Sequence, residues 1–198
     1  MTGRSLVVVA HPDPGSFTHA VARAAVAGLE RAGHEVRLID LYAEGFRADM
    51  SVDERRAYQS EEPMIDPQVR EHADLVRASN HLVFVYPTWW SGLPAILKGW
   101  LERVLVTGVA FRFCERTGKV RPALTHVRRI VGISTYGSSR TYVGLINDNG
   151  RRILGRALWM SCSWRTRRTW LALYSADTAT DARRREFLAR VEARMELL

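Results

Sequence analysis

Apolar residues along the chain fall into two alternating patterns. Short continuous apolar runs, typical of strands buried on both faces of a sheet, occupy residues 6–10, 36–41, 82–86, 129–135 and 169–174. Apolar residues at helical spacing separate them and occupy residues 17–32, 97–105, 151–160 and 181–198. Residues 51–79 are polar and predict two helical pieces, broken at Pro63 and Pro67. The alternation predicts a single α/β domain over residues 1–198, with a doubly wound, five-stranded parallel sheet and helices on both faces.

Three unusual loops follow the first, third and fourth predicted strands. They cover residues 11–18, 87–92 and 136–140. In sheets of this kind ligands bind beyond the carboxyl ends of the strands, near the point where the strand order reverses. We therefore expect the three loops to form one ligand site.

The first loop leads into a predicted helix. Ser16 and Thr18 offer hydroxyl groups there, and the first N–H groups of the helix have no partner within it. With the helix dipole they form an anion site suited to a phosphate. The alternative is that Ser16 only caps the helix. His11 alone is compatible with ligation, with donation to a phosphate or with a hydrogen bond in the turn.

The other two loops offer aromatic and hydroxyl groups. Backbone amides around Trp89 and Trp90 can bond to the edge of a flat heterocycle, although core packing is the alternative reading of both indoles. Trp100 we assign to the core. Residues 134–137 are small or hydroxyl-bearing, as suits a backbone that approaches a ligand closely, and Tyr142 lies just beyond. A phenol such as Tyr142 can donate to a developing anion, or it can be an ordinary half-buried tyrosine.

Length and composition limit the class of protein. The chain has 198 residues, 46% of them apolar, which is enough for a sizeable core without disulfides. Cys114 and Cys162 are its only cysteines, so a disulfide scaffold and a four-cysteine zinc site are excluded. No apolar run approaches the length of a membrane span, and the first residues lack the layout of a signal peptide. We expect a cytoplasmic protein with free thiols and no stable membrane insertion.

Charge is distributed unevenly along the chain. The formal net charge is +8, with −3 on residues 1–100 and +11 on residues 101–198, and only Lys98 and Lys119 are lysines. A basic half is compatible with nucleic acid or with an anionic ligand. No stacking aromatics or recognition motif accompany the arginines, so we favour solvated faces and expect no nucleic-acid partner.

Several catalytic and nucleotide-binding motifs are absent from the sequence. Neither G-x-G-x-x-G after the first strand nor G-x-x-x-x-G-K-[ST] is present. A G-x-S-x-G elbow, C-x-x-C and H-E-x-x-H are also missing, so we expect no metal centre.

Together the loops resemble the flavodoxin-like NAD(P)H:quinone oxidoreductases, the family of DT-diaphorase, the modulator-of-drug-activity quinone reductases and the ancillary quinone reductases of potassium-efflux systems. The most specific matches are HPDPGSF at 11–17, YPTWW at 86–90 and LPAILKGWLERV at 93–104. Further matches lie at 33–36, 40–42, 108–111, 134–137 and Tyr142. The likeness spans residues 5 to 145 and implies the strand order 2-1-3-4-5.

The resemblance implies a non-covalently bound flavin, FMN or FAD. The residues expected to hold its phosphate are His11, Ser16, Phe17 and Thr18. Those expected along the isoalloxazine edge, through backbone amides, are Pro87, Thr88, Trp89 and Trp90. Those expected on its other side are Thr135, Tyr136 and Gly137, with Tyr142 near the pyrimidine end.

The resemblance also implies a reaction and an assembly. NAD(P)H would give hydride to the flavin and leave, after which a quinone would take its place and receive two electrons, a ping-pong scheme. Phe111 and Phe113, with Trp89, would line the substrate slot, which in the family is shared between the chains of a homodimer. Tyr142 and Tyr136 are the candidate catalytic residues.

Two positions depart from the family pattern. Some relatives place a histidine after the tyrosine as a proton-relay partner, whereas this chain has Asn147, Asp148 and Asn149 there. We therefore expect Tyr142 to act as a hydrogen-bond donor alone. Tyr136 stands where many relatives have glycine, and we expect it to narrow the slot above the flavin.

Two other functions compete with this interpretation. A regulatory flavoprotein that binds a transport system would share the flavin site. Residues 10–13 are also similar to the AHPDD segment of LmbE-like zinc N-deacetylases, but Pro14 replaces the second aspartate and no later H-x-x-H follows. A His–Asp pair alone supplies too few ligands for zinc.

Overall fold

A five-stranded parallel sheet forms the centre of the molecule in a computed structural model that describes residues 3–58, 60 and 62–198. Its strands are β1 (Arg4–Val9), β2 (Glu35–Asp40), β3 (His81–Pro87), β6 (Arg129–Thr135) and β7 (Arg167–Leu173). They lie in the order β2-β1-β3-β6-β7. The predicted order 2-1-3-4-5 is confirmed, because β4 and β5 belong to a separate hairpin.

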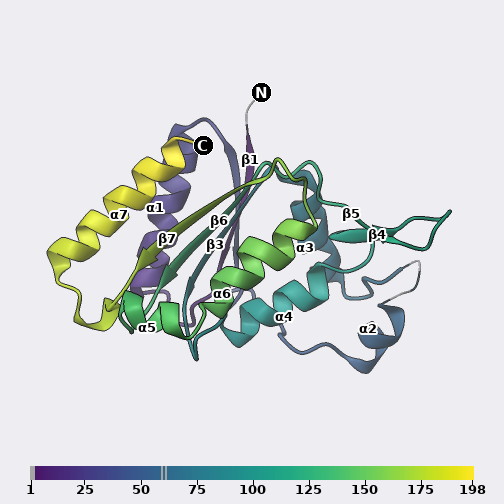
Figure 1. The fold of residues 1–198 in the computed structure, drawn as a ribbon, viewed down its shortest axis with the longest axis horizontal. Helices are drawn as coiled ribbons and strands as arrows, with labels where there is room; N and C mark the ends of the chain where they lie inside the picture. Colours follow the sequence, from purple (N-terminus) through teal and green to yellow (C-terminus); the bar gives the residue numbers. More distant parts are fainter. Residues whose placement is uncertain (1–2, 59, 61) are drawn as a thin grey trace.

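Helices cover both faces of the sheet (Figure 1). On one face α1 (Phe17–Arg31) packs against α7 (Asp181–Glu196). There Gly28 permits a close approach, since a Cβ at this position would lie 2.3 Å from the carbonyl oxygen of Glu192. On the other face lie α3 (Pro67–Ala78), α4 (Ala95–Val104) and the helix that α6 (Asn149–Arg152) and the π-helical η1 (Ile153–Leu158) form together. The predicted core position of Trp100 is confirmed, because its side chain is fully buried in α4.

Some elements differ from the sequence prediction. The helix expected from residue 151 begins at Asn149, and the strand expected from 169 begins at Arg167. The predicted pieces of 51–79 are α2 (Val52–Ala57) and α3. The sequence analysis missed α5 (Arg140–Leu145), η2 (Ala176–Thr178) and the hairpin of β4 (Phe111–Phe113) and β5 (Val120–Pro122), because each is too short for a periodic apolar pattern.

A buried arginine fixes the connection between β2 and α3. Arg103 of α4 is 2% exposed and donates to Glu54 at 2.7 Å, to Asp66 at 2.6 Å and to the carbonyl oxygen of Arg47. Nearby, a Cβ on Gly99 would lie 2.0 Å from the carbonyl oxygen of Ala48. The connection is therefore held to α4 both by charge and by close backbone packing.

Among the described residues, no helix combines the length and the apolar character that crossing a bilayer requires.

Candidate active site

The three predicted loops meet at the carboxyl edge of the sheet. The strands that lead into them are in register, since Val9 pairs with Val85 and Val85 with Ile133. The N–H of Thr88 donates to the carbonyl oxygen of Thr135 at 2.8 Å, which joins the second loop to the third. The structure therefore brings together the segments that the sequence analysis selected.

The first loop leaves hydrogen-bond donors at the start of α1. Asp13 shapes the turn by accepting from the N–H of Gly15 at 2.8 Å, and Ser16 caps the helix by accepting from the N–H of His19 at 3.4 Å. The N–H groups of Phe17 and Thr18 lie in the first helical turn, where no intrahelical acceptor exists. This geometry suits an anion. Ser16 is a cap, and its capping role leaves the neighbouring amides free.

A histidine that the sequence analysis missed orients Ser16. Nδ1 of His19 lies 3.1 Å from the Ser16 hydroxyl, and Nε2 lies 2.9 Å from a carboxylate oxygen of Asp40, at the end of β2. The imidazole is almost completely buried. The signal in the sequence was the spacing of Ser16 and His19 by three residues across the helix start. The two side chains therefore act as one hydrogen-bonded chain.

His11 joins the first loop to the second. Its Nδ1 accepts from the N–H of Asp13 at 3.0 Å, so the proton of the neutral ring lies on Nε2. The ring centroid is 5.7 Å from that of Trp89 and 6.2 Å from that of His19. Nε2 is thus a donor at the open edge of the sheet.

The second loop is a tight turn with a strained backbone. Trp89 and Gly92 form an antiparallel bridge, and the two residues between them have positive φ, 45° at Trp90 and 59° at Ser91. This is the conformation of a type I′ turn, which favours glycine or asparagine. Trp90 is fully exposed. Strain of this kind in larger residues is found mostly at functional sites.

The hydrogen bonds of this turn correct the expected role of two backbone amides. The N–H of Thr88 is bonded to Thr135, and that of Trp89 donates to Gly92 at 3.3 Å, so neither is free for a ring edge. Pro87 has no N–H and is buried. Among the described residues the amides of Trp90 and Ser91 have no acceptor, and these are the donors that the turn offers.

The structure also corrects the expectation that Tyr136 narrows an open slot. Its side chain is 1% exposed, its ring stacks on Tyr174 at 4.9 Å, and its hydroxyl donates to the Asp148 carboxylate at 3.1 Å. Burial, followed by the charge of Asp148, raises the pKa of Tyr136 above its ordinary value. The ring turns inward because the carboxylate and the second aromatic ring give it partners that the loop edge lacks.

Gly137 and Tyr142 remain at the open edge. Gly137 is exposed, and a Cβ there would lie 2.6 Å from a carboxylate oxygen of Asp177. Tyr142 lies on α5, a short helix capped by Ser139, and is 51% exposed. Its phenol is therefore accessible to a ligand, in contrast to that of Tyr136.

Phe111 and Phe113 do not join this site within one chain. They lie on β4, with ring centroids 6.1 Å apart, and Phe113 is 46% exposed. The hairpin of β4 and β5 projects from the opposite end of the molecule from α5 (Figure 1).

The described part of the chain contains no group of three or more His, Cys, Asp and Glu side chains able to hold a metal ion. His11 and Asp13, the pair behind the zinc alternative, are joined through a backbone bond in the turn.

The strand order and the three loops at the carboxyl edge define a flavodoxin-like α/β protein. The chain belongs to the family of that fold, whose sequence model matches residues 3–154.

Curated and solved relatives agree with this assignment. The chain is 32% identical over 154 residues to NAD(P)H dehydrogenase [quinone] 1 of Rattus norvegicus, which covers 70% of this chain and 56% of that protein. The chain therefore spans just over half the length of this curated relative. The solved NAD(P)H:quinone oxidoreductase of Methanothermobacter marburgensis is 25% identical with a TM-score of 0.78, covering 99% of this chain and 96% of that one. An FMN-dependent NADH-azoreductase of Bacillus anthracis, solved with FMN, shares the fold at 15% identity and a TM-score of 0.73, covering 99% of each chain.

Proposed function

We propose that this protein is a flavin-dependent NAD(P)H:quinone oxidoreductase. The observation that carries the proposal is the set of unpaired N–H donors in two adjoining loops, on the first turn of α1 and in the turn at Trp90 and Ser91. One set suits a phosphate and the other suits the polar edge of a flat ring. A relative named NAD(P)H dehydrogenase [quinone] 1 matches 70% of this chain.

The first loop would hold the flavin phosphate. The amides of Phe17 and Thr18 point along the helix axis, where the dipole favours negative charge. Nε2 of His11 adds a side-chain donor beside the turn. The Ser16 hydroxyl, which bonds to Nδ1 of His19, would turn to the phosphate when it binds. This donor set fits FMN and equally the inner phosphate of FAD.

The second and third loops would hold the ring. The amides of Trp90 and Ser91 would bond to its edge, and Trp89 would pack beside it. Thr135 and Gly137 would lie on the other side of the ring. Thr135 is joined to the second loop because its carbonyl oxygen accepts from the N–H of Thr88. A bound flavin supplies the hydride-transfer chemistry that carries two electrons from NAD(P)H to the acceptor.

Tyr142 would act as the hydrogen-bond donor of the site. Its phenol is exposed and lies on a short helix at the open edge. A donor aimed at a position where negative charge develops lowers the barrier of a hydride transfer. Tyr136 would stabilise the third loop from the protein interior through its hydrogen bond to Asp148.

A homodimer would complete the substrate slot. Phe111, which is half-buried, and Phe113, which is exposed, form an aromatic pair far from the loops of their own chain. In a two-fold dimer such a pair can face the loops of the partner. Light scattering at working concentration should give twice the chain mass, and a monomer would refute this part of the proposal. The free thiols Cys114 and Cys162 are compatible with a cytoplasmic setting.

The visible spectrum of the purified protein tests the cofactor. We expect a yellow protein that releases FMN or FAD on heat denaturation, with chromatography of the supernatant deciding between the two. A colourless protein that fails to take up added flavin would refute the proposal. Rapid oxidation of NADH or NADPH with quinones would then separate an enzyme from a regulatory flavoprotein, which would turn over poorly without its partner.

A further inference from the structure

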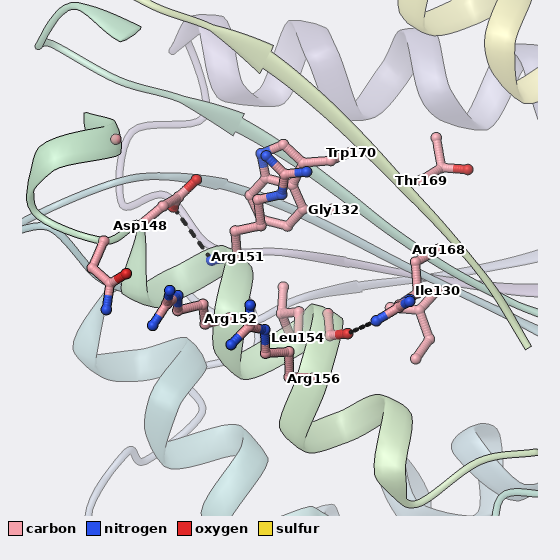
Figure 2. A pocket seen from close by; sticks show the side chains of 13 residues that line it. Ile130, Gly132, Asp148, Arg151, Arg152, Leu154, Arg156, Arg168, Thr169 and Trp170 are labelled. Carbon is pink, nitrogen blue, oxygen red and sulfur yellow. Dashed lines mark hydrogen bonds between the residues drawn. The ribbon is translucent and has the colours of Figure 1, made fainter. Parts of the chain in front are cut away.

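A cavity of about 540 Å³ lies on the face of the sheet covered by α6 and η1. Its walls come from that helix, from α5 and the turn after it, from the middle of β6 and from the edge strand β7 (Figure 2). None of the loop residues at 11–18 or 87–92 lines it. The cavity is therefore lined by other residues than the first and second loops, and it adjoins the third loop only through Asp148, which bonds to Tyr136.

Positive charge dominates the lining. Arg151, Arg152 and Arg156 project from one helix, and Arg168 from β7 across the cavity (Figure 2). Asp148 is the single carboxylate of the lining, and it already accepts from Tyr136. Within the described ranges none of the four arginines pairs with a carboxylate, so their charge is uncompensated.

Two of the arginines are held in place by the protein. Arg168 donates to the carbonyl oxygen of Gly155 at 2.8 Å, and its guanidinium lies 4.6 Å from the ring centroid of Trp159. Arg151 lies 5.9 Å from the ring centroid of Trp170. Stacking on an aromatic face orders a guanidinium while leaving its N–H groups free to donate.

The other two arginines carry an electrostatic cost. Arg152 and Arg156 are four residues apart on one helix, and like charges at this spacing repel each other. An anion between them would turn that repulsion into attraction.

The local backbone leaves room for such a ligand. A Cβ on Gly144 or on Gly155 would meet no atom within 4 Å. The helix also widens into a π-helix at Ile153–Leu158, a feature that is frequent at functional sites.

We propose that this cavity binds the phosphate group of a small molecule, as a second site beyond the flavin loops. Phosphate matches the planar, bidentate donors of several guanidinium groups better than a halide or a single carboxylate does. The phosphate can belong to a free anion or to the ribose of the nicotinamide donor, and the experiment below separates these sources.

The test is a calorimetric titration of the purified, flavin-loaded protein with inorganic pyrophosphate. We compare the wild type with the double variant Arg152→Gln/Arg156→Gln and with the matched control Arg183→Gln/Arg185→Gln, on the exposed side of α7. Both variants remove two exposed positive charges. We expect the cavity variant to bind pyrophosphate at least about tenfold more weakly, and the control within about twofold of the wild type. Thermal unfolding verifies that both variants fold.

Two outcomes would overturn the proposal. One is a wild type that does not bind pyrophosphate at millimolar concentration, and the other is equal weakening in both variants, which would indicate net charge alone. The titration is repeated on the protein as purified if no flavin is taken up, so this result does not depend on the proposed enzymatic function.

Adenosine 2′,5′-bisphosphate identifies the source of the phosphate. If it competes with pyrophosphate, and the cavity variant raises KM for NADPH while leaving KM for NADH unchanged, the site holds the ribose phosphate of the donor. If it does not compete, the site holds a separate phosphorylated ligand. Either result requires the cavity to bind phosphate.

Discussion

The polar groups at the two ends of the central strands differ in whether they are hydrogen-bonded within the protein. At the amino ends, Ser5 is fully buried, and its hydroxyl lies 2.7 Å from Nδ1 of His34. His34 in turn stacks on His81 at 4.7 Å, with the two Nδ1 atoms 3.2 Å apart. These polar groups are satisfied by one another.

At the carboxyl ends, donors remain free and the backbone is strained. The amides of Phe17 and Thr18 at the start of α1 and the amides of Trp90 and Ser91 lack acceptors among the described residues. A chain that satisfies its polar groups at one end and leaves them free at the other is arranged for a ligand at the second end. The predictions that follow test this contrast.

The largest effect is expected at the amino ends, as a dependence of stability on pH. Burial, then the charges of His34 and of Arg129, lowers the pKa of His81 from 6.5 to about 4. The folded protein therefore keeps this ring neutral while the unfolded chain takes up a proton, so stability is full above pH 6.5 and falls as the pH drops toward 4. We expect a loss of about 2 kcal/mol in the free energy of unfolding between pH 7 and pH 5.

Urea unfolding at several pH values measures this loss. His81→Phe should flatten the decline, whereas His126→Gln, at an exposed histidine, should leave it as in the wild type. If the free energy of unfolding of His81→Phe falls with pH as steeply as that of the wild type, the pair of His34 and His81 does not cause the pH dependence.

The next largest effect is expected at the phosphate turn. Ser16→Ala and Thr180→Ala each remove a helix N-cap, so both should lose about 1 kcal/mol of stability. Only Ser16→Ala should weaken flavin binding, by about tenfold to thirtyfold, which is a loss of about 1.5–2 kcal/mol, in the lower part of the range for a hydroxyl bonded to a charged group. Fluorescence titration with FMN and FAD gives the affinities. Equal flavin affinity in Ser16→Ala and Thr180→Ala would show that Ser16 does not contact the flavin.

A smaller effect is expected from Tyr142→Phe. We predict that kcat with a quinone falls about tenfold while flavin affinity stays within about twofold, because the lost donor acts on charge that develops during transfer. Tyr58→Phe is the matched control, at a half-buried tyrosine at the end of α2, outside the three loops. A kcat equal to that of the wild type would exclude Tyr142 from the reaction.

The smallest effect is expected from Ser91→Gly. Glycine adopts the φ of 59° without steric cost, so the apoprotein should gain about 0.5–1 kcal/mol of stability. Denaturant unfolding of the apoprotein measures this gain. Destabilisation would show that the side chain of Ser91 makes a contribution larger than the strain.

The sequence predicted the helices and strands that carry a long apolar or periodic pattern. It missed the features that depend on single contacts between side chains. The five strands and their order followed from continuous apolar runs and from the family resemblance, and both are confirmed. The bond of His19 to Asp40 joins residues that are distant in sequence, so periodicity gave no sign of it. Tyr136 was expected to narrow the slot above the flavin because it stands where many relatives have glycine, whereas its bond to Asp148, twelve residues away, holds it in the interior. The roles of the loop residues toward a ligand stay predictions.

The buried guanidinium of Arg103 also bears on how the molecule opens. Glu54, Asp66 and the carbonyl oxygen of Arg47 lie on different parts of the connection between β2 and α3, yet all three bond to this one cation. Releasing any one of them leaves a buried charge less compensated, so the three contacts are lost together. In hydrogen exchange the amides of this connection would therefore behave as one cooperative unit, which detaches from α4 while the parallel sheet stays protected.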